Sequence, residues 1–136
     1  MNILVADDSR LDRLLIENIL KKNHYKVITA KDGDEALRAF KKDDFDLAII
    51  DWMMPPTGGL KICKEIREIE ARTGHFCYIL MVTGKKTVED EVRAFEAGIN
   101  DYITKPFDEA ILVARVKAGI KIIDDRHNLL SQIDTI

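Results

Sequence analysis

Residues 47–51 read Leu47-Ala48-Ile49-Ile50-Asp51, an uninterrupted apolar run that ends in a carboxylate. A strand buried on both faces of a parallel sheet has this continuous apolar character, whereas a half-exposed strand alternates between apolar and polar residues. Four more runs of strand length follow the same pattern: Ile3–Ala6, Val27–Ala30, Tyr78–Val82 and Tyr102–Thr104. We therefore expect five strands, each buried on both faces.

Segments with helical periodicity separate these runs. Their expected buried stripes are Leu11, Leu14, Leu15 and Ile19; Ala36, Leu37 and Phe40; Ile62, Ile66 and Ile69; and Val92, Phe95 and Ala97. A last helix is expected to begin near Glu109 and to continue past Ile123. Strand and helix alternate five times along the chain, which predicts a doubly wound α/β domain.

The composition is that of an ordinary globular protein. The chain has 136 residues, 46% of them hydrophobic, and its 21 Lys and Arg residues against 24 Asp and Glu residues give a net charge of −3. Direct nucleic-acid binding and membrane-surface binding rely on basic patches, so this mildly acidic balance argues against both. We find no apolar run of membrane-spanning length and no signal-peptide pattern, and expect a cytoplasmic protein.

Polar side chains follow four of the five expected strands. Asp7-Asp8 ends the first strand, Asp51 the third, Thr83 the fourth and Lys105 the fifth. In an open α/β sheet the ligand site forms outside the carboxyl ends of the strands, so these side chains are expected to converge on one edge. Clustered carboxylates repel one another and favour a hard cation, for which Mg²⁺ is the natural choice.

These positions resemble the receiver domain of two-component response regulators. The motifs are Asp7-Asp8, Asp51 followed by Met54-Pro55 and Gly59, Thr83-Gly84, and Ala97–Tyr102 leading into Lys105-Pro106-Phe107. The resemblance covers about residues 2–123. It implies a flavodoxin-like (CheY-like) fold, in which a parallel sheet of strand order 2-1-3-4-5 carries five helices.

The same resemblance implies a phosphoryl-transfer site. Asp51 would be the nucleophile that accepts a phosphoryl group from a sensor histidine kinase or a phosphotransfer protein. Mg²⁺, or Mn²⁺ in its place, would be held by the carboxylates of Asp7, Asp8 and Asp51 and by the backbone carbonyl of Met53. One departure from the family pattern is Gly58, where an Asp or Asn commonly stands, so the third helix lacks an expected cap.

Three further residues have roles implied by the resemblance. Lys105, preceding Pro106 through a cis peptide bond, would offset charge on the phosphoryl oxygens, and Thr83 would donate a hydrogen bond to one of them. Thr83 would then move toward the phosphoryl group while Tyr102 rotates inward. This switch would alter the surface of the fourth helix, fifth strand and fifth helix, and we expect it to promote a phosphorylation-dependent homodimer.

The end of the chain is expected to differ from the rest. We expect the receiver domain over residues 1–123 and a helical extension or linker over residues 124–136. Val116, Ile123 and Leu130 lie seven residues apart, which hints at a short coiled coil, although Gly119 interrupts it. The stretch 113–120 is similar to receivers that precede diguanylate cyclase (GGDEF), HD-GYP or phosphatase output domains.

Two alternative functions stay open at this point. One is a stand-alone receiver that relays a phosphoryl group or acts as an adaptor. The other is an Asp-dependent phosphohydrolase, but such enzymes commonly need a second acid two residues after the nucleophile, where this chain has Met53. We therefore expect a signalling domain that is not an enzyme and catalyses only its own phosphorylation and dephosphorylation.

Overall fold

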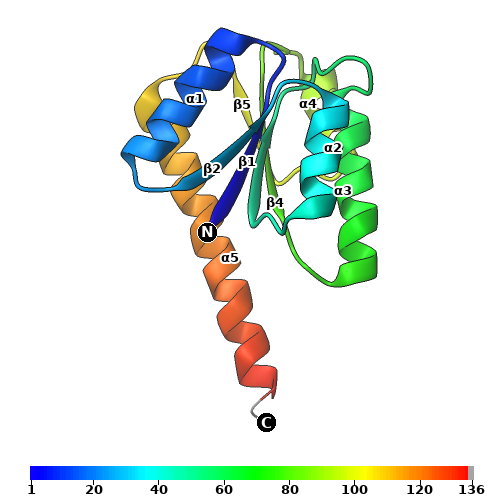
Figure 1. Cartoon of the computed structure of the whole chain (residues 1–136), viewed down its shortest axis with the longest axis vertical. Helices are drawn as coiled ribbons and strands as arrows, with labels where there is room; N and C mark the ends of the chain where they lie inside the picture. Colours follow the sequence, from blue (N-terminus) through cyan, green and yellow to red (C-terminus); the bar gives the residue numbers. More distant parts are fainter. Residues whose placement is uncertain (135–136) are drawn as a thin grey trace.

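A central parallel sheet with helices on both faces organises residues 1–134, the part of the chain that the computed structural model describes (Figure 1). The strands are β1 (Asn2–Ala6), β2 (Lys26–Ala30), β3 (Leu47–Ile50), β4 (Tyr78–Thr83) and β5 (Asp101–Thr104). Their order in the sheet is β2-β1-β3-β4-β5, and every neighbouring pair is parallel. The predicted strand order and fold class are confirmed.

The helices cover the sheet in two layers. They are α1 (Arg10–Lys22), α2 (Gly33–Lys42), α3 (Gly59–Thr73), α4 (Val88–Glu96) and α5 (Glu109–Asp134). The pair α1 and α5 packs on one face of the sheet, whereas α2, α3 and α4 pack on the other (Figure 1). Because each crossover helix returns the chain to the end of the sheet where the strands begin, all strands are parallel and end at one edge.

The two faces of the sheet build two separate hydrophobic layers. Successive residues of a strand point to opposite faces, so Leu4 and Ala6 of β1 join the layer under α2 and α3, while Ile3 and Val5 join the layer under α1 and α5. All four side chains are buried. The central strands therefore have no solvent-facing side, which accounts for their unbroken apolar sequence.

The edge strand β2 departs from the sequence prediction. Its burial alternates: Val27 packs against the layer under α1 and α5, whereas Ile28, which points to the other face, is exposed. The expectation that all five strands are buried on both faces is therefore wrong for β2.

The predicted buried stripes of two helices are wrong in part. In α1, Ile19 is buried as predicted, together with Ile16 and Leu20, but Leu11, Leu14 and Leu15 are exposed. Of the stripe predicted around α4, Ala97 is buried, whereas Val92 and Phe95 are exposed and Ala94 faces the core. The stripes predicted for α2 and α3 do face the core, with Ala36, Phe40, Ile62 and Ile66 buried.

The last helix is 26 residues long and extends well past the sheet (Figure 1). Its inner half lies close to the sheet at Gly119, where an added Cβ would lie 2.7 Å from a ring carbon of Tyr78. Val116 and Ile123 are buried in the domain's own core, so the predicted heptad does not present them to a second helix.

Beyond Ile123 the apolar side chains of α5 are unburied. Leu129, Leu130 and Ile133 are all exposed. A cation–π contact links this outer half to the domain: the Arg126 guanidinium lies 4.6 Å from the centroid of the Phe76 ring. The helix is continuous at the expected domain boundary, and residues 135–136 of the expected extension lie outside the described part. Within residues 1–134, no helix combines the length and the apolar character needed to cross a membrane.

Candidate functional site

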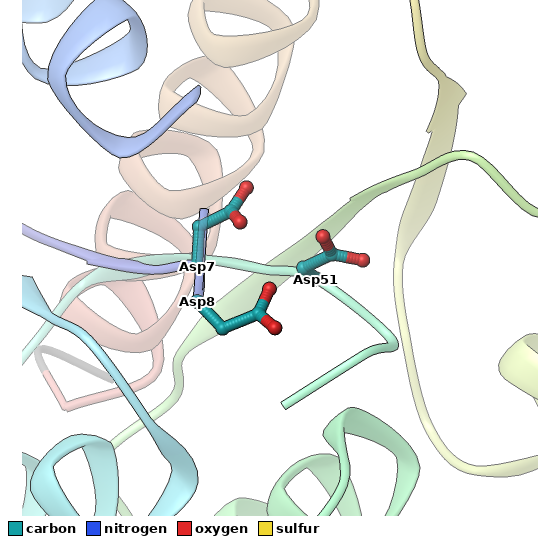
Figure 2. A group of neighbouring side chains, drawn as sticks. All are labelled: Asp7, Asp8 and Asp51. Carbon is teal, nitrogen blue, oxygen red and sulfur yellow. The ribbon is translucent and has the colours of Figure 1, made fainter. Parts of the chain in front are cut away.

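Three carboxylates meet where β1 and β3 end, at the carboxyl edge of the sheet. Asp7 and Asp8 follow β1, and Asp51 follows β3, the strand beside it. One carboxylate oxygen from each lies within 4.8 Å of the other two. Figure 2 shows the three side chains as neighbours. Asp7 and Asp51 are buried, whereas Asp8 is exposed. The sequence prediction that these three side chains converge is confirmed.

Lys105 supplies the positive charge of the cluster. Its ammonium donates hydrogen bonds to Asp7 at 2.8 Å and to Asp51 at 2.9 Å. The residue follows β5, and a cis peptide bond joins it to Pro106, as predicted. Burial acts to lower the pKa of Lys105, but its hydrogen bonds to carboxylates outweigh burial and raise that pKa above its ordinary value. Lys105 is therefore firmly cationic.

A third carboxylate on Lys105 was not anticipated from the sequence. Asp12, in the first turn of α1, accepts a 2.7 Å hydrogen bond from the same ammonium. The one available signal was the spacing of Ser9 and Asp12, a Ser-x-x-Asp pattern at a helix start, but this pattern predicts a cap and not an ion pair. Asp12 thus joins the site from the first turn of α1, which none of the site motifs includes.

Asp7 is held from two sides. One of its carboxylate oxygens accepts a 2.9 Å hydrogen bond from the backbone N–H of Ser9, and the other accepts from Lys105. Arg13 donates a 2.8 Å hydrogen bond to the backbone carbonyl of Asp7. Burial raises the pKa of Asp7 above its ordinary value, although the hydrogen bonds from Lys105 and Ser9 act in the opposite direction. Removing this carboxylate from water is therefore costly, which favours a cation beside it.

Thr83 and Met53 flank the acidic cluster. Thr83 is the buried last residue of β4, next to β3 in the sheet, and its hydroxyl accepts a 3.4 Å hydrogen bond from the Lys85 backbone N–H. The backbone N–H of Met53 donates to the Asp51 carboxylate at 3.2 Å, while the Met53 side chain is 56% exposed. The chain therefore turns tightly just after Asp51. The second residue after Asp51 is Met53, so no acidic side chain stands there.

The loop after Asp51 needs a glycine at Gly59. The Gly59 N–H donates a 2.8 Å hydrogen bond to the Trp52 carbonyl, and an added Cβ would collide with the Asp51 carbonyl oxygen. Gly58 occupies the N-cap of α3 and makes no side-chain capping bond, as predicted. The backbone of Asp51 is thus held by close packing of the loop and not by a cap.

Tyr102 and Trp52 connect the site to α4. Tyr102 is 9% exposed, and its hydroxyl donates a 2.7 Å hydrogen bond to the backbone carbonyl of Lys85. The Trp52 ring has two cations near it, the Lys85 ammonium at 5.3 Å and the Arg93 guanidinium at 5.4 Å from its centroid. The loop that follows Thr83 is therefore held by β5 on one side and by the residue after Asp51 on the other.

A doubly wound parallel sheet with an acidic cluster and a lysine at its carboxyl edge defines the class of phosphoryl-accepting α/β signalling domains. Residues 3–117 match the family model of the response regulator receiver domain, and the chain belongs to that family. The resemblance inferred from the motifs is confirmed.

Individual relatives agree with this assignment. Over 119 residues, 88% of the chain, it is 40% identical to the transcriptional regulatory protein ResD of Bacillus subtilis (strain 168) and 42% identical to the regulatory protein VanR of Enterococcus faecium. These matches cover 48% of ResD and 49% of VanR. The chain thus spans about half the length of the curated relatives it matches.

A solved structure covers nearly the whole chain. The CheY-like response regulator receiver domain protein from Methanospirillum hungatei JF-1 has a TM-score of 0.84 and 25% sequence identity, and the match covers 92% of this chain and 97% of that one. The similarity therefore spans an entire receiver domain.

Proposed function

We propose that this receiver domain accepts a phosphoryl group on Asp51 and transmits its presence through the surface of α4, β5 and α5. The observation that carries the proposal is the arrangement around Asp51: a buried carboxylate with Lys105 at 2.9 Å and two further carboxylates beside it. A buried nucleophile with a fixed cation and room for a divalent ion is suited to phosphoryl transfer.

The proposed reaction moves one phosphoryl group between two proteins. A carboxylate oxygen of Asp51 attacks the phosphorus of a phosphohistidine on a sensor histidine kinase or phosphotransfer protein. The P–O bond forms as the P–N bond breaks, and the imidazole nitrogen keeps the electron pair and takes a proton from solvent. The product is an aspartyl phosphate, so Asp51 loses its own negative charge and gains that of the phosphoryl group.

The donor set fits Mg²⁺ or Mn²⁺. Hard divalent cations take carboxylate, carbonyl and water oxygens, and Asp7, Asp8 and Asp51 supply three carboxylates in reach of one another. We assign the backbone carbonyl of Met53 as the fourth protein ligand. When bound, the cation neutralises charge on the phosphoryl oxygens. Lys105 and Thr83 contribute an ammonium and a hydroxyl to the same oxygens.

The proposed switch uses Thr83 and Tyr102. A phosphoryl group on Asp51 draws the Thr83 hydroxyl toward it, and the loop that begins at Gly84 follows. Tyr102 is already mostly buried and bonded to Lys85 in that loop, which supports a coupling between the loop and β5. The exposed apolar residues Val92 and Phe95 of α4 lie on the surface that would change.

The output is proposed to lie beyond this domain. ResD is a transcriptional regulatory protein and VanR a regulatory protein, and the chain matches about half of each. We propose residues 1–123 as the receiver and residues 124–136 as its helical connection, with a phosphorylation-dependent homodimer as the signalling state. Sedimentation with and without beryllofluoride, on the full chain and on residues 1–123, tests this. An unchanged monomer in the full chain argues for a stand-alone receiver.

The central experiment is intact mass spectrometry after incubation with acetyl phosphate and Mg²⁺. We expect a gain of one phosphoryl group in the wild type and none in Asp51→Ala or in the presence of a chelator. No adduct with any small donor would overturn the proposal. A phosphohydrolase would instead turn over a generic phosphate ester many times per protein molecule, and we expect no such turnover.

A further inference from the structure

All three N–H groups of the Lys105 ammonium are in use. They donate to Asp7 at 2.8 Å, to Asp12 at 2.7 Å and to Asp51 at 2.9 Å. Asp7 and Asp51 belong to the acidic cluster that fits a divalent cation, whereas Asp12 does not. The shortest of the three bonds therefore goes to a carboxylate that has no part in the proposed metal site or in accepting the phosphoryl group.

The fold leaves Asp12 free for this contact. Ser9 caps α1 by accepting a 3.3 Å hydrogen bond from the Asp12 N–H, which places Asp12 where a capping-box acid stands. Such an acid ordinarily reaches back to the N–H of the cap residue, but here Asp7 takes the Ser9 N–H at 2.9 Å. The Asp12 carboxylate turns to Lys105 instead.

We propose that Asp12 is a positioning residue for Lys105, which it holds at the α1 side of the site while Asp7 and Asp51 change their partners. This inference rests on the proposed function. When a divalent cation binds between Asp7, Asp8 and Asp51, it takes over carboxylate charge that Lys105 now neutralises. When Asp51 is esterified, Lys105 loses that carboxylate as well. Asp12 is the one partner of Lys105 that neither event removes.

Two consequences follow from this role. First, the Lys105 ammonium can withdraw from Asp7 and still keep Asp12 as a carboxylate partner. Asp12 therefore lowers the free-energy cost of freeing Asp7 to bind the cation. Second, one N–H fixed on Asp12 directs the other two toward the phosphoryl oxygens, which reduces the orientational freedom lost during transfer. The side chain of Asp12 is one-third exposed, so its replacement is not expected to disrupt the core.

A double-mutant cycle with Asp12→Asn and Lys105→Met distinguishes this role from a direct electrostatic attraction between the Asp12 carboxylate and the bound cation. Calorimetry gives the Mg²⁺ dissociation constant of each protein. We expect Asp12→Asn to weaken binding about fivefold in the Lys105 background and less than about twofold in the Lys105→Met background. Glu17→Gln, on the same helix and paired with Lys21 at 3.1 Å, removes the same charge and is expected to change nothing.

A second readout is the rate of phosphorylation by acetyl phosphate at saturating Mg²⁺, followed by intact mass. We expect Asp12→Asn to slow it about threefold or more. Asp12→Ser is the substitute if Asp12→Asn does not fold. A coupling between Asp12 and Lys105 smaller than twofold in the Mg²⁺ dissociation constant would overturn the inference. The calorimetric arm needs no phosphorylation, so a wild type that stays unmodified would sink the proposed function and leave the Asp12 result standing.

Discussion

The hydroxyl of Tyr102 donates a 2.7 Å hydrogen bond to the backbone carbonyl of Lys85, across 17 residues of sequence. This bond joins the edge strand β5 to the loop after β4, two residues beyond Thr83. A displacement of Thr83 therefore reaches Tyr102 through a single short stretch of backbone. The connection is specific to a hydroxyl, since a phenylalanine would keep the ring and lose the bond.

Tyr102 is expected to lower stability at high pH. Burial, together with the negative charges of Asp90, Glu91 and Asp51, raises its pKa to about 12. The unfolded chain releases this proton near pH 10, so it binds fewer protons than the folded state between about pH 10 and 12. The free energy of unfolding should fall across that window in the wild type. Alkaline chemical denaturation should show a smaller fall in Tyr102→Phe, and an equal fall in both proteins would contradict the assignment.

Mg²⁺ is expected to raise the melting temperature. At ten times its dissociation constant, a ligand that binds only the folded state adds about 1.4 kcal/mol to the free energy of unfolding. Differential scanning calorimetry with and without Mg²⁺ measures this gain. Asp8→Asn should abolish it, whereas the exposed Glu89→Gln on α4 should keep it. Equal gains in these two variants would mean that the cation binds elsewhere.

Lys105→Met should destabilise the metal-free domain by roughly 2–3 kcal/mol, because it leaves two buried carboxylates, Asp7 and Asp51, without a positive partner. Saturating Mg²⁺ supplies positive charge to the same carboxylates, so the deficit should shrink when it is added. Urea denaturation of both proteins in both conditions gives the four free energies required. A deficit that does not depend on Mg²⁺ would show that lost packing, and not unpaired charge, is responsible.

Gly119→Ala should destabilise the domain by roughly 1–3 kcal/mol, since the new methyl group would press on the Tyr78 ring. Helix propensity alone predicts the opposite, a gain of about 1 kcal/mol. Thermal unfolding decides between the two signs. Ala118→Gly on the exposed side of the same helix is the control and should cost only the propensity difference.

Removal of residues 124–136 should leave the receiver folded. The buried core of α5 ends at Ile123, and the cation–π contact from Arg126 to Phe76 is worth about 0.5–1 kcal/mol. A chain of residues 1–123 should therefore unfold cooperatively with a small loss of stability, which Arg126→Ala in the full chain should largely reproduce. Loss of cooperative unfolding would mean that the domain needs the extension.

The central strands could be predicted from the sequence because their residues are buried on both faces of the sheet. Every residue of β3 is buried between two helical layers, so the apolar run from Leu47 to Ile50 coincides with the strand itself. The convergence of Asp7, Asp8 and Asp51 followed from parallel strands ending at one edge. Position along the chain was enough for both predictions.

The wrong predictions concern helices whose sequence pattern is compatible with more than one buried face. In α1, Ile19 has helical spacing both with Leu11 and Leu15 and with Ile16 and Leu20, and periodicity does not say which of these residues face the sheet with it. The contact between Asp12 and Lys105 spans 93 residues and exists only because the Lys105 side chain, just after β5, reaches the first turn of α1. Local patterns carry no information on such a contact.

The continuous α5 helix carries a movement of the domain to a point well outside it. Its inner half is clamped to the sheet by Val116, Gly119 and Ile123, and at 1.5 Å per residue its outer half projects about 16 Å further. By the same geometry, a tilt of about 10° at the clamp would sweep the far end through roughly 3 Å. A small rotation of α5 on the sheet would thus arrive at the far end as a movement the size of a side-chain contact.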